Sequence, residues 1–145
     1  MKYFYLMVLT FYMSGCQSQV QIKSSKVEKQ ITVAKQFIEA LYKDDNNAVK
    51  YLFDSLVIKA AKTEDEILQA ILETKNQIKK EYGENLPVIE YITSEQTTIE
   101  SKASIYLILK LETPKLFGYY NFFISNESNK VLLVQEYSNV LDKTN

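Results

Sequence analysis

The side chains of this 145-residue sequence that can do chemistry are carboxylates, tyrosines, lysines and one cysteine, Cys16, because histidine is absent. Without histidine, Ser-His-Asp triads, imidazole general bases and the usual zinc sites are excluded. The three glycines, Gly15, Gly83 and Gly118, lie too far apart for a phosphate-binding loop. We therefore expect no metal and no cofactor, and a catalytic site would have to use carboxylates, tyrosine and lysine.

The acidic run Asp44–Asn47 has the residue types that bind calcium. A calcium loop needs ligands at alternating positions, a central glycine and a closing glutamate. Here Ala48, Val49 and Lys50 follow instead, so the run does not fit that geometry. Asp and Asn side chains also cap helices, and we expect this run to end one helix and begin the next.

Cys16 closes a segment with a pattern of its own. Lys2 is followed by the mostly apolar run Tyr3–Met13 and by two small residues, Ser14 and Gly15. A basic start, a short apolar run and a small-residue cleavage site are typical of a secretory signal peptide. The run is about half of the ~20 residues that a membrane-spanning helix needs. The end of the segment resembles the lipobox of bacterial lipoproteins; the alternative interpretation of Cys16 is a small buried core residue.

The lipoprotein resemblance implies a location. In that family the cysteine takes a diacylglycerol and the chain is cut just before it. Residues 1–15 would then be the signal peptide, and the lipid on Cys16 would make the membrane a partner. Gln17, rather than Asp, implies the outer membrane, facing the periplasm. Removal of Lys2 with the signal changes the formal net charge from −1 to −2, and every basic residue is lysine, so we expect no nucleic-acid partner.

Three amphipathic helices are expected after a polar tether, residues 16–25. Capping boxes mark two helix starts, and Gly83 marks a helix end. The capping boxes are Ser25 with Glu28 and Thr63 with Glu66. The expected helices are residues 25 to about 43, the segment after residue 47 to about 61, and residues 63–82.

From Val88 onward the hydrophobic period changes to two, which indicates strands. The expected strands are residues 88–97, 102–112, 116–125 and 130–138. Polar residues 126–129 join the last two as a hairpin. Helices followed by a meander of strands predict one α+β domain, residues 26–140, with the helices on one face of a four-stranded antiparallel sheet. Residues 141–145 are expected to form a tail.

The segment Val33–Asp45 resembles the opening helix of small exported NTF2-like domains, in which an apolar helix ends in a Gly-Asp or similar turn. The likeness covers residues 27–138 through the order of the elements, with Asp44 where the family often has glycine. It implies a curved sheet that forms a cone with the helices, as in cystatin-like folds. NTF2-like domains include enzymes, binding modules and assembly factors, so the fold does not choose the function.

The resemblance also implies where a site would lie, since NTF2-like enzymes place a carboxylate and a tyrosine inside the cone. Glu136 with Tyr137, or Asp54 after Phe53, would imitate that arrangement. A pocket carboxylate with a raised pKa would serve as a proton-transfer base; the alternative is a solvent-facing residue on a half-exposed strand. The candidate residues of the cone are Phe37, Leu41, Tyr51, Phe53 and Glu136, with either Tyr106 or Tyr120, depending on the strand phase.

Aromatic residues of the expected strand 116–125 indicate a partner surface. One phase of this strand is apolar and should face the helices, yet the other phase is also rich in aromatic rings. The rings of this second phase and their expected neighbours on the preceding strand are Phe117, Tyr119, Phe123, Tyr106 and Ile108. Such rings are favoured at interface centres, so a second copy or another protein is the expected occupant. The alternative is cover by the segment Val140–Leu141 or by a third helix.

These features predict a lipid-anchored envelope protein that acts as a non-catalytic binding module for a protein partner or a small apolar ligand. Two other functions stay open. One is a proton-transfer enzyme of the isomerase or dehydratase type that uses Glu136 or Asp54, and the other is a lipoprotein that inhibits a toxin as an immunity protein. A deep cavity with two converging polar groups would favour the enzyme, and a filled cone would favour the binding module.

Overall fold

The structure, a computed structural model, describes residues 25–143, and for residues 137–140 it describes the backbone alone. The expected signal peptide, Cys16 and the tether up to residue 24 lie outside the described residues. Between residues 25 and 143, no helix combines the length and the apolar character that crossing a membrane requires.

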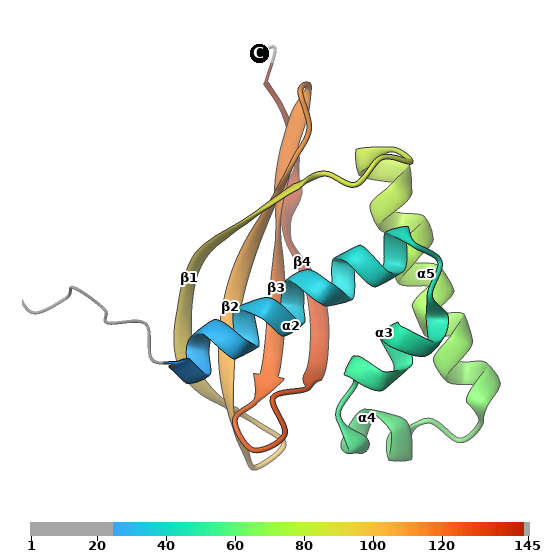
Figure 1. Ribbon diagram of the computed structural model, residues 1–145, viewed down its shortest axis with the longest axis vertical. Helices are drawn as coiled ribbons and strands as arrows, with labels where there is room; N and C mark the ends of the chain where they lie inside the picture. The colour runs from blue at the N-terminus through green and yellow to red at the C-terminus, as the bar shows by residue number, and fades with distance from the viewer. Residues whose placement is uncertain (1–24, 144–145) are drawn as a thin grey trace, which may run out of the picture.

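Within this part of the chain, four helices precede a β-sheet (Figure 1). The helices are α2 (Ser25–Tyr42), α3 (Asn46–Leu52), α4 (Ser55–Ala60) and α5 (Glu64–Tyr82). Helix α2 buries the predicted apolar stripe, because side chains three and four residues apart share one face. The buried members of that stripe are Ile31, Ala34, Phe37, Ile38 and Leu41.

The turn after α2 confirms the predicted capping role of the acidic run. Asp44 has a φ of 56°, in the left-handed region that Asp tolerates better than most residues. The Asp45 carboxylate accepts a 2.9 Å hydrogen bond from the N–H of Ala48 and so caps α3. Asp44 is also held from outside the turn, since Lys75 of α5 donates to it at 2.9 Å.

The prediction of one continuous second helix is wrong. The chain breaks at Phe53 and Asp54, which have extended backbone angles and separate α3 from α4. Two contacts explain the break. The Asp54 N–H donates to the carbonyl of Val131 at 2.8 Å, and the Asp54 carboxylate accepts from the N–H of Leu56 as the cap of α4. The apolar periodicity runs through the break and therefore conceals it.

Helix α5 has the predicted start, stop and buried face. The Thr63 hydroxyl accepts from the Glu66 N–H at 3.2 Å, and the Glu66 carboxylate accepts from the N–H of Lys62. Gly83 ends the helix with a φ of 86° and donates its N–H to Lys79. The buried side chains of α5 are Ile67, Ile71, Ile78 and Tyr82.

The strands form an antiparallel meander in the order β1-β2-β3-β4, which confirms the α+β class. They are β1 (Val88–Ile99), β2 (Lys102–Glu112), β3 (Leu116–Ser125) and β4 (Val131–Asp142). In Figure 1, the strands curve strongly, α2 crosses one face of the sheet, and α3, α4 and α5 lie toward its β4 side. Phe53 adds a single parallel bridge to Val131 at the outer edge of β4.

Both edge strands are longer than predicted. Strand β1 continues to Ile99 and contains a bulge at Ile92, between the pairs made by Tyr91 and Thr93. Strand β4 continues to Asp142, and Leu141 pairs with Phe117. The predicted tail that starts at residue 141 is therefore corrected, because its first two residues belong to the sheet.

Side chains fill the space between α2 and the sheet. The Phe37 ring is 1% exposed and meets the rings of Phe53 and Phe122 edge-on, at centroid distances of 5.3 and 5.7 Å. The predicted inward phase of β3 and the apolar phase of β2 that pairs with it complete this core. Their fully buried members are Ile105, Leu107, Leu109, Leu111, Phe122 and Ile124.

One buried polar residue, Gln30, was not predicted. Its amide donates to the Asn126 side chain at 3.0 Å and to the Ser125 carbonyl at 3.5 Å. A buried amide N–H needs a hydrogen-bond acceptor. These two bonds provide one and join the first turns of α2 to the hairpin between β3 and β4.

Candidate functional site

The candidate cone-lining residues are divided among four environments rather than brought together, and Tyr106 is not in the cone, because it lies on the outer face of the sheet beside Phe123. Phe37 lies in the core and Phe53 is half-buried beside it. Tyr120 and Glu136 pair across β3 and β4 near the C-terminal half of α5. Tyr51 stands on α3 with 73% of its surface exposed. The predicted set therefore does not form one site.

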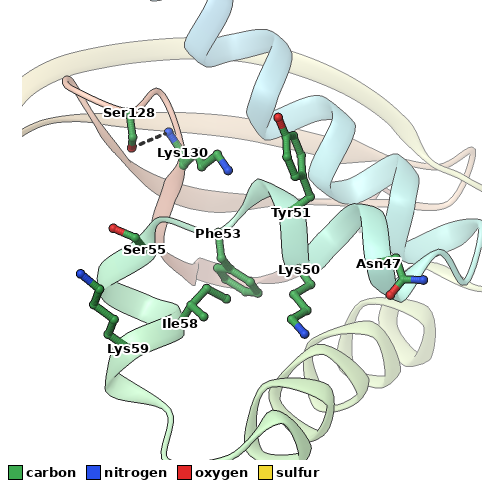
Figure 2. Close-up of a pocket in the computed structure, with 9 residues that line it drawn as sticks. All are labelled: Asn47, Lys50, Tyr51, Phe53, Ser55, Ile58, Lys59, Ser128 and Lys130. Atoms are coloured by element: carbon green, nitrogen blue, oxygen red, sulfur yellow. Dashed lines mark hydrogen bonds between the residues drawn. The ribbon is translucent and has the colours of Figure 1, made fainter.

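A hollow of about 590 Å³ lies between α3, α4 and the β3–β4 hairpin, and we call it the lysine groove (Figure 2). Its lining residues are Asn47, Lys50, Tyr51, Phe53, Ser55, Ile58, Lys59, Ser128 and Lys130. Figure 2 shows Phe53 and Ile58 at the centre of this lining, with Lys59, Lys50 and Lys130 around them. The groove therefore combines an apolar centre with cationic borders, and its size is in the range of small-molecule sites, ~300–1,000 Å³.

The break between α3 and α4 creates the groove. Phe53 leaves the helix to bridge Val131, which turns its ring toward Phe37 on one side and the groove on the other. Helix α4 then restarts in a new direction and adds Ile58 and Lys59 to the lining. A continuous helix over these residues would not give this concave surface.

Tyr51 and Lys130 form one wall of the groove. The Lys130 ammonium lies 4.0 Å from the centroid of the Tyr51 ring, in the geometry of a cation–π contact. A second hollow, of about 670 Å³, lies on the other side of this pair against α2 and shares Tyr51, Ser128 and Lys130 with the groove. The Tyr51–Lys130 pair is therefore accessible from both sides.

The charge of the lysine groove is positive. Lys50 forms an ion pair with Glu64 of α5, whereas Lys59 and Lys130 have no ion-pair partner among the described residues. No carboxylate is among the residues that line the groove. Two ammonium groups are thus available at the border of an apolar surface.

Asp54, a predicted candidate base, lies fully buried next to the groove. Burial alone would raise the pKa of its carboxyl, but hydrogen bonds from the Leu56 N–H, the Ser128 hydroxyl and Lys102 outweigh that effect and lower the pKa. The Lys102 ammonium lies 3.1 Å from the carboxylate. A carboxylate that is ionised and already accepts three hydrogen bonds is suited to hold the hairpin and α4 in place, not to remove a proton.

Glu136, the other candidate base, belongs to a second cluster together with Tyr120, another predicted pocket residue. Here the Tyr120 hydroxyl donates to Glu81 at 2.8 Å, and Gln77 donates to Glu136 at 3.1 Å. Burial and the charge of Glu81 raise the pKa of Glu136, against the effect of the Gln77 bond. The Tyr82 ring lies 6.2 Å from Tyr120. Tyr120 and Glu136 are predicted pocket residues, whereas Glu81 and Gln77, which α5 contributes, are not.

The predicted aromatic face on the outer side of the sheet is present, and its strands pair in register. Tyr106 lies opposite Phe123, with ring centroids 5.2 Å apart, and Phe117 contacts Tyr119 edge-on at 5.9 Å. All of these rings are half-buried, because they cover one another. Leu141, expected to cover this face as part of a tail, instead pairs with Phe117 as a strand residue and is 49% exposed.

Comparisons with protein-family models, with curated proteins and with solved structures give no match to this chain.

Proposed function

We propose that this chain is a lipid-anchored protein of the bacterial cell envelope whose domain binds an apolar ligand in the lysine groove without catalysing a reaction. The observation that carries the proposal is the groove itself, a hollow of about 590 Å³ with Phe53 and Ile58 at its centre and Tyr51, 73% exposed, at its wall. A large exposed aromatic ring beside an apolar hollow is typical of a binding surface.

The interior of the domain supports binding rather than catalysis. The space between α2 and the sheet is occupied by Phe37, Phe53 and Phe122, in the manner of a filled cone. In the groove, the hydroxyl of Ser128 is hydrogen-bonded to Asp54, whose lowered pKa makes it a weak base. The groove residues thus offer contacts for a ligand and no activated nucleophile.

The proposed location and fold rest on the two resemblances in the sequence. The segment that ends at Cys16 resembles a lipobox, which would place the protein on the outer membrane, facing the periplasm. The order of helices followed by a curved antiparallel sheet supports an NTF2-like domain over residues 27–138. Cys16→Ser is expected to move the protein out of the membrane fraction; equal fractionation of both forms would contradict the anchor.

Binding is tested with a neutral photoreactive probe, a dodecyl alcohol that carries a diazirine, added to the full-length protein in phosphatidylcholine nanodiscs. Cross-links mapped by peptide mass spectrometry are expected on the segments 47–59 and 128–130. Tyr51→Ser removes one wall, and loss of about 40 Å² of apolar contact corresponds to ~1 kcal/mol, or about fivefold weaker labelling. Val88→Ser, at a residue 69% exposed on β1, is the matched control. Equal labelling of the groove segments in native protein and Tyr51→Ser would refute the site.

The aromatic outer face supports a second candidate function, association with another copy of the chain. Its rings lie in two contacting pairs, Tyr106 with Phe123 and Phe117 with Tyr119, at the centre of a sheet face that no described helix covers in Figure 1. Tyr119→Ser combined with Phe123→Ser is expected to halve the mass measured by light scattering. A monomeric mass for the native protein would exclude self-association.

A further inference from the structure

The lysines at the border of the groove carry an inference that rests on the proposed function and makes it more specific. We infer that the ligand is an anionic amphiphile, an acyl chain or apolar ring system that bears one acidic group. The apolar part of the ligand contacts Phe53 and Ile58, and the acidic group lies at the cationic border of the groove to which Lys59 and Lys130 contribute.

Charge complementarity is the first argument for this ligand class. Among the described residues, the ion pairs of the chain occupy Lys50, Lys75, Lys79, Lys102, Lys110 and Lys143, but neither Lys59 nor Lys130. Both of these free ammonium groups border the same apolar hollow, and no carboxylate lines it. A neutral ligand would leave them without an anion, and a cationic ligand would be repelled.

The position of Lys130 is the second argument. Its ammonium is held 4.0 Å from the Tyr51 ring centroid, at the wall shared by the groove and the 670 Å³ hollow against α2. A cation fixed over a ring loses little side-chain entropy when it binds an anion. The Ser55 hydroxyl lines the same groove and supplies a neutral hydrogen-bonding group, whereas the Ser128 hydroxyl already donates to Asp54.

The test compares three photoreactive dodecyl probes that differ only in the head group: carboxylate, alcohol and trimethylammonium. The full-length protein is held in phosphatidylcholine nanodiscs, and labelling of the groove segments is measured. The measured quantity is the carboxylate-to-alcohol labelling ratio, and it is compared between native protein and variant because the probes enter the bilayer to different extents. Lys59→Gln combined with Lys130→Gln is expected to lower this ratio about fivefold relative to the native protein, as for two partly exposed ion pairs.

The matched control is Lys115→Gln, at an exposed lysine of the turn between β2 and β3. It is expected to leave the ratio unchanged. An unchanged ratio in the double variant, with the alcohol probe still labelling the groove, would overturn the acidic ligand class and leave the proposed binding function in place. In nanodiscs that contain phosphatidylglycerol, a fall of the carboxylate-to-alcohol ratio of the native protein to that of the double variant would support the same ligand class, because phosphatidylglycerol is itself an acyl amphiphile with one acidic group. Absence of groove labelling by the alcohol probe would instead refute the proposed function itself.

Discussion

Replacement of Asp54 by alanine is expected to destabilise the protein by about 3 kcal/mol. The carboxylate caps α4 through the Leu56 N–H, and loss of a helix cap costs about 1 kcal/mol. The same change removes the ionised acceptor of Lys102 and Ser128. Hydrogen bonds to charged groups contribute ~1.5–3 kcal/mol each. The side chain of Lys102 is 26% exposed and can turn to water, so we expect about 1 kcal/mol for each of these bonds.

Urea denaturation followed by far-ultraviolet circular dichroism measures this loss. Asp45→Ala is the matched control, since Asp45 caps α3 by the same kind of bond but is exposed and is expected to cost only about 1 kcal/mol. Asp54→Asn keeps an acceptor for the cap and is expected to fall between the two. A loss for Asp54→Ala no larger than that for Asp45→Ala would refute the argument that Asp54 holds the hairpin and α4 together.

The pH dependence gives the same reasoning a second test. The pKa of Asp54 is lower in the folded protein than its ordinary value of 3.8, so its charge stabilises the fold above that value. This contribution is lost as the pH falls through the lower, folded-state pKa. The stability difference between native protein and Asp54→Asn is therefore expected to be full near neutral pH and to disappear in acid. A difference independent of pH would contradict it.

Three further predictions use the same denaturation assay. Phe37→Ala leaves a cavity between Phe53 and Phe122 and is expected to cost about 4 kcal/mol; a cost below about 2 kcal/mol would show that this core is not closely packed. In Gly83→Ala, the added Cβ has no atom within 4 Å, but the residue must adopt a φ of 86° with a ψ of −176°. Backbone strain of about 2 kcal/mol is therefore expected, and an unchanged free energy of unfolding would exclude that strain. The pKa of Glu136 is raised, so the folded protein loses stability as the pH rises from the ordinary value of 4.5 through the raised pKa. Glu136→Gln is therefore expected to stabilise the protein near neutral pH but not below pH 4.5. Destabilisation at both pH values would contradict a raised pKa.

Local signals in the sequence were sufficient for most of the secondary structure. The limits of β2 and β3 agree with prediction because alternation of side chains and a turn mark each end. The stop at Gly83 was predictable because glycine adopts positive φ without penalty. The break at Phe53 and Asp54 was missed, since it depends on hydrogen bonds to Val131 and Ser128, more than seventy residues away.

The lysine groove was not predictable for the same reason. Of its lining residues only Tyr51 and Phe53 were candidates, and both were placed in the cone. Lys59 and Lys130 have no periodic relation, and they meet only because the β3–β4 hairpin lies against the α3–α4 break. A signal did exist in part: Asp54 followed by Ser55 is a capping pair within an apolar run.

The free edge of β1 has a consequence for a protein that would be crowded at a surface. Within the described residues β1 pairs only with β2, which leaves a long row of backbone donors and acceptors open to strand addition. The bulge at Ile92 interrupts that row, and Glu90 and Glu95 place exposed negative charges on either side of it. Two molecules that approach through this edge therefore meet mismatched backbones and like charges, which protects the protein against edge-to-edge aggregation.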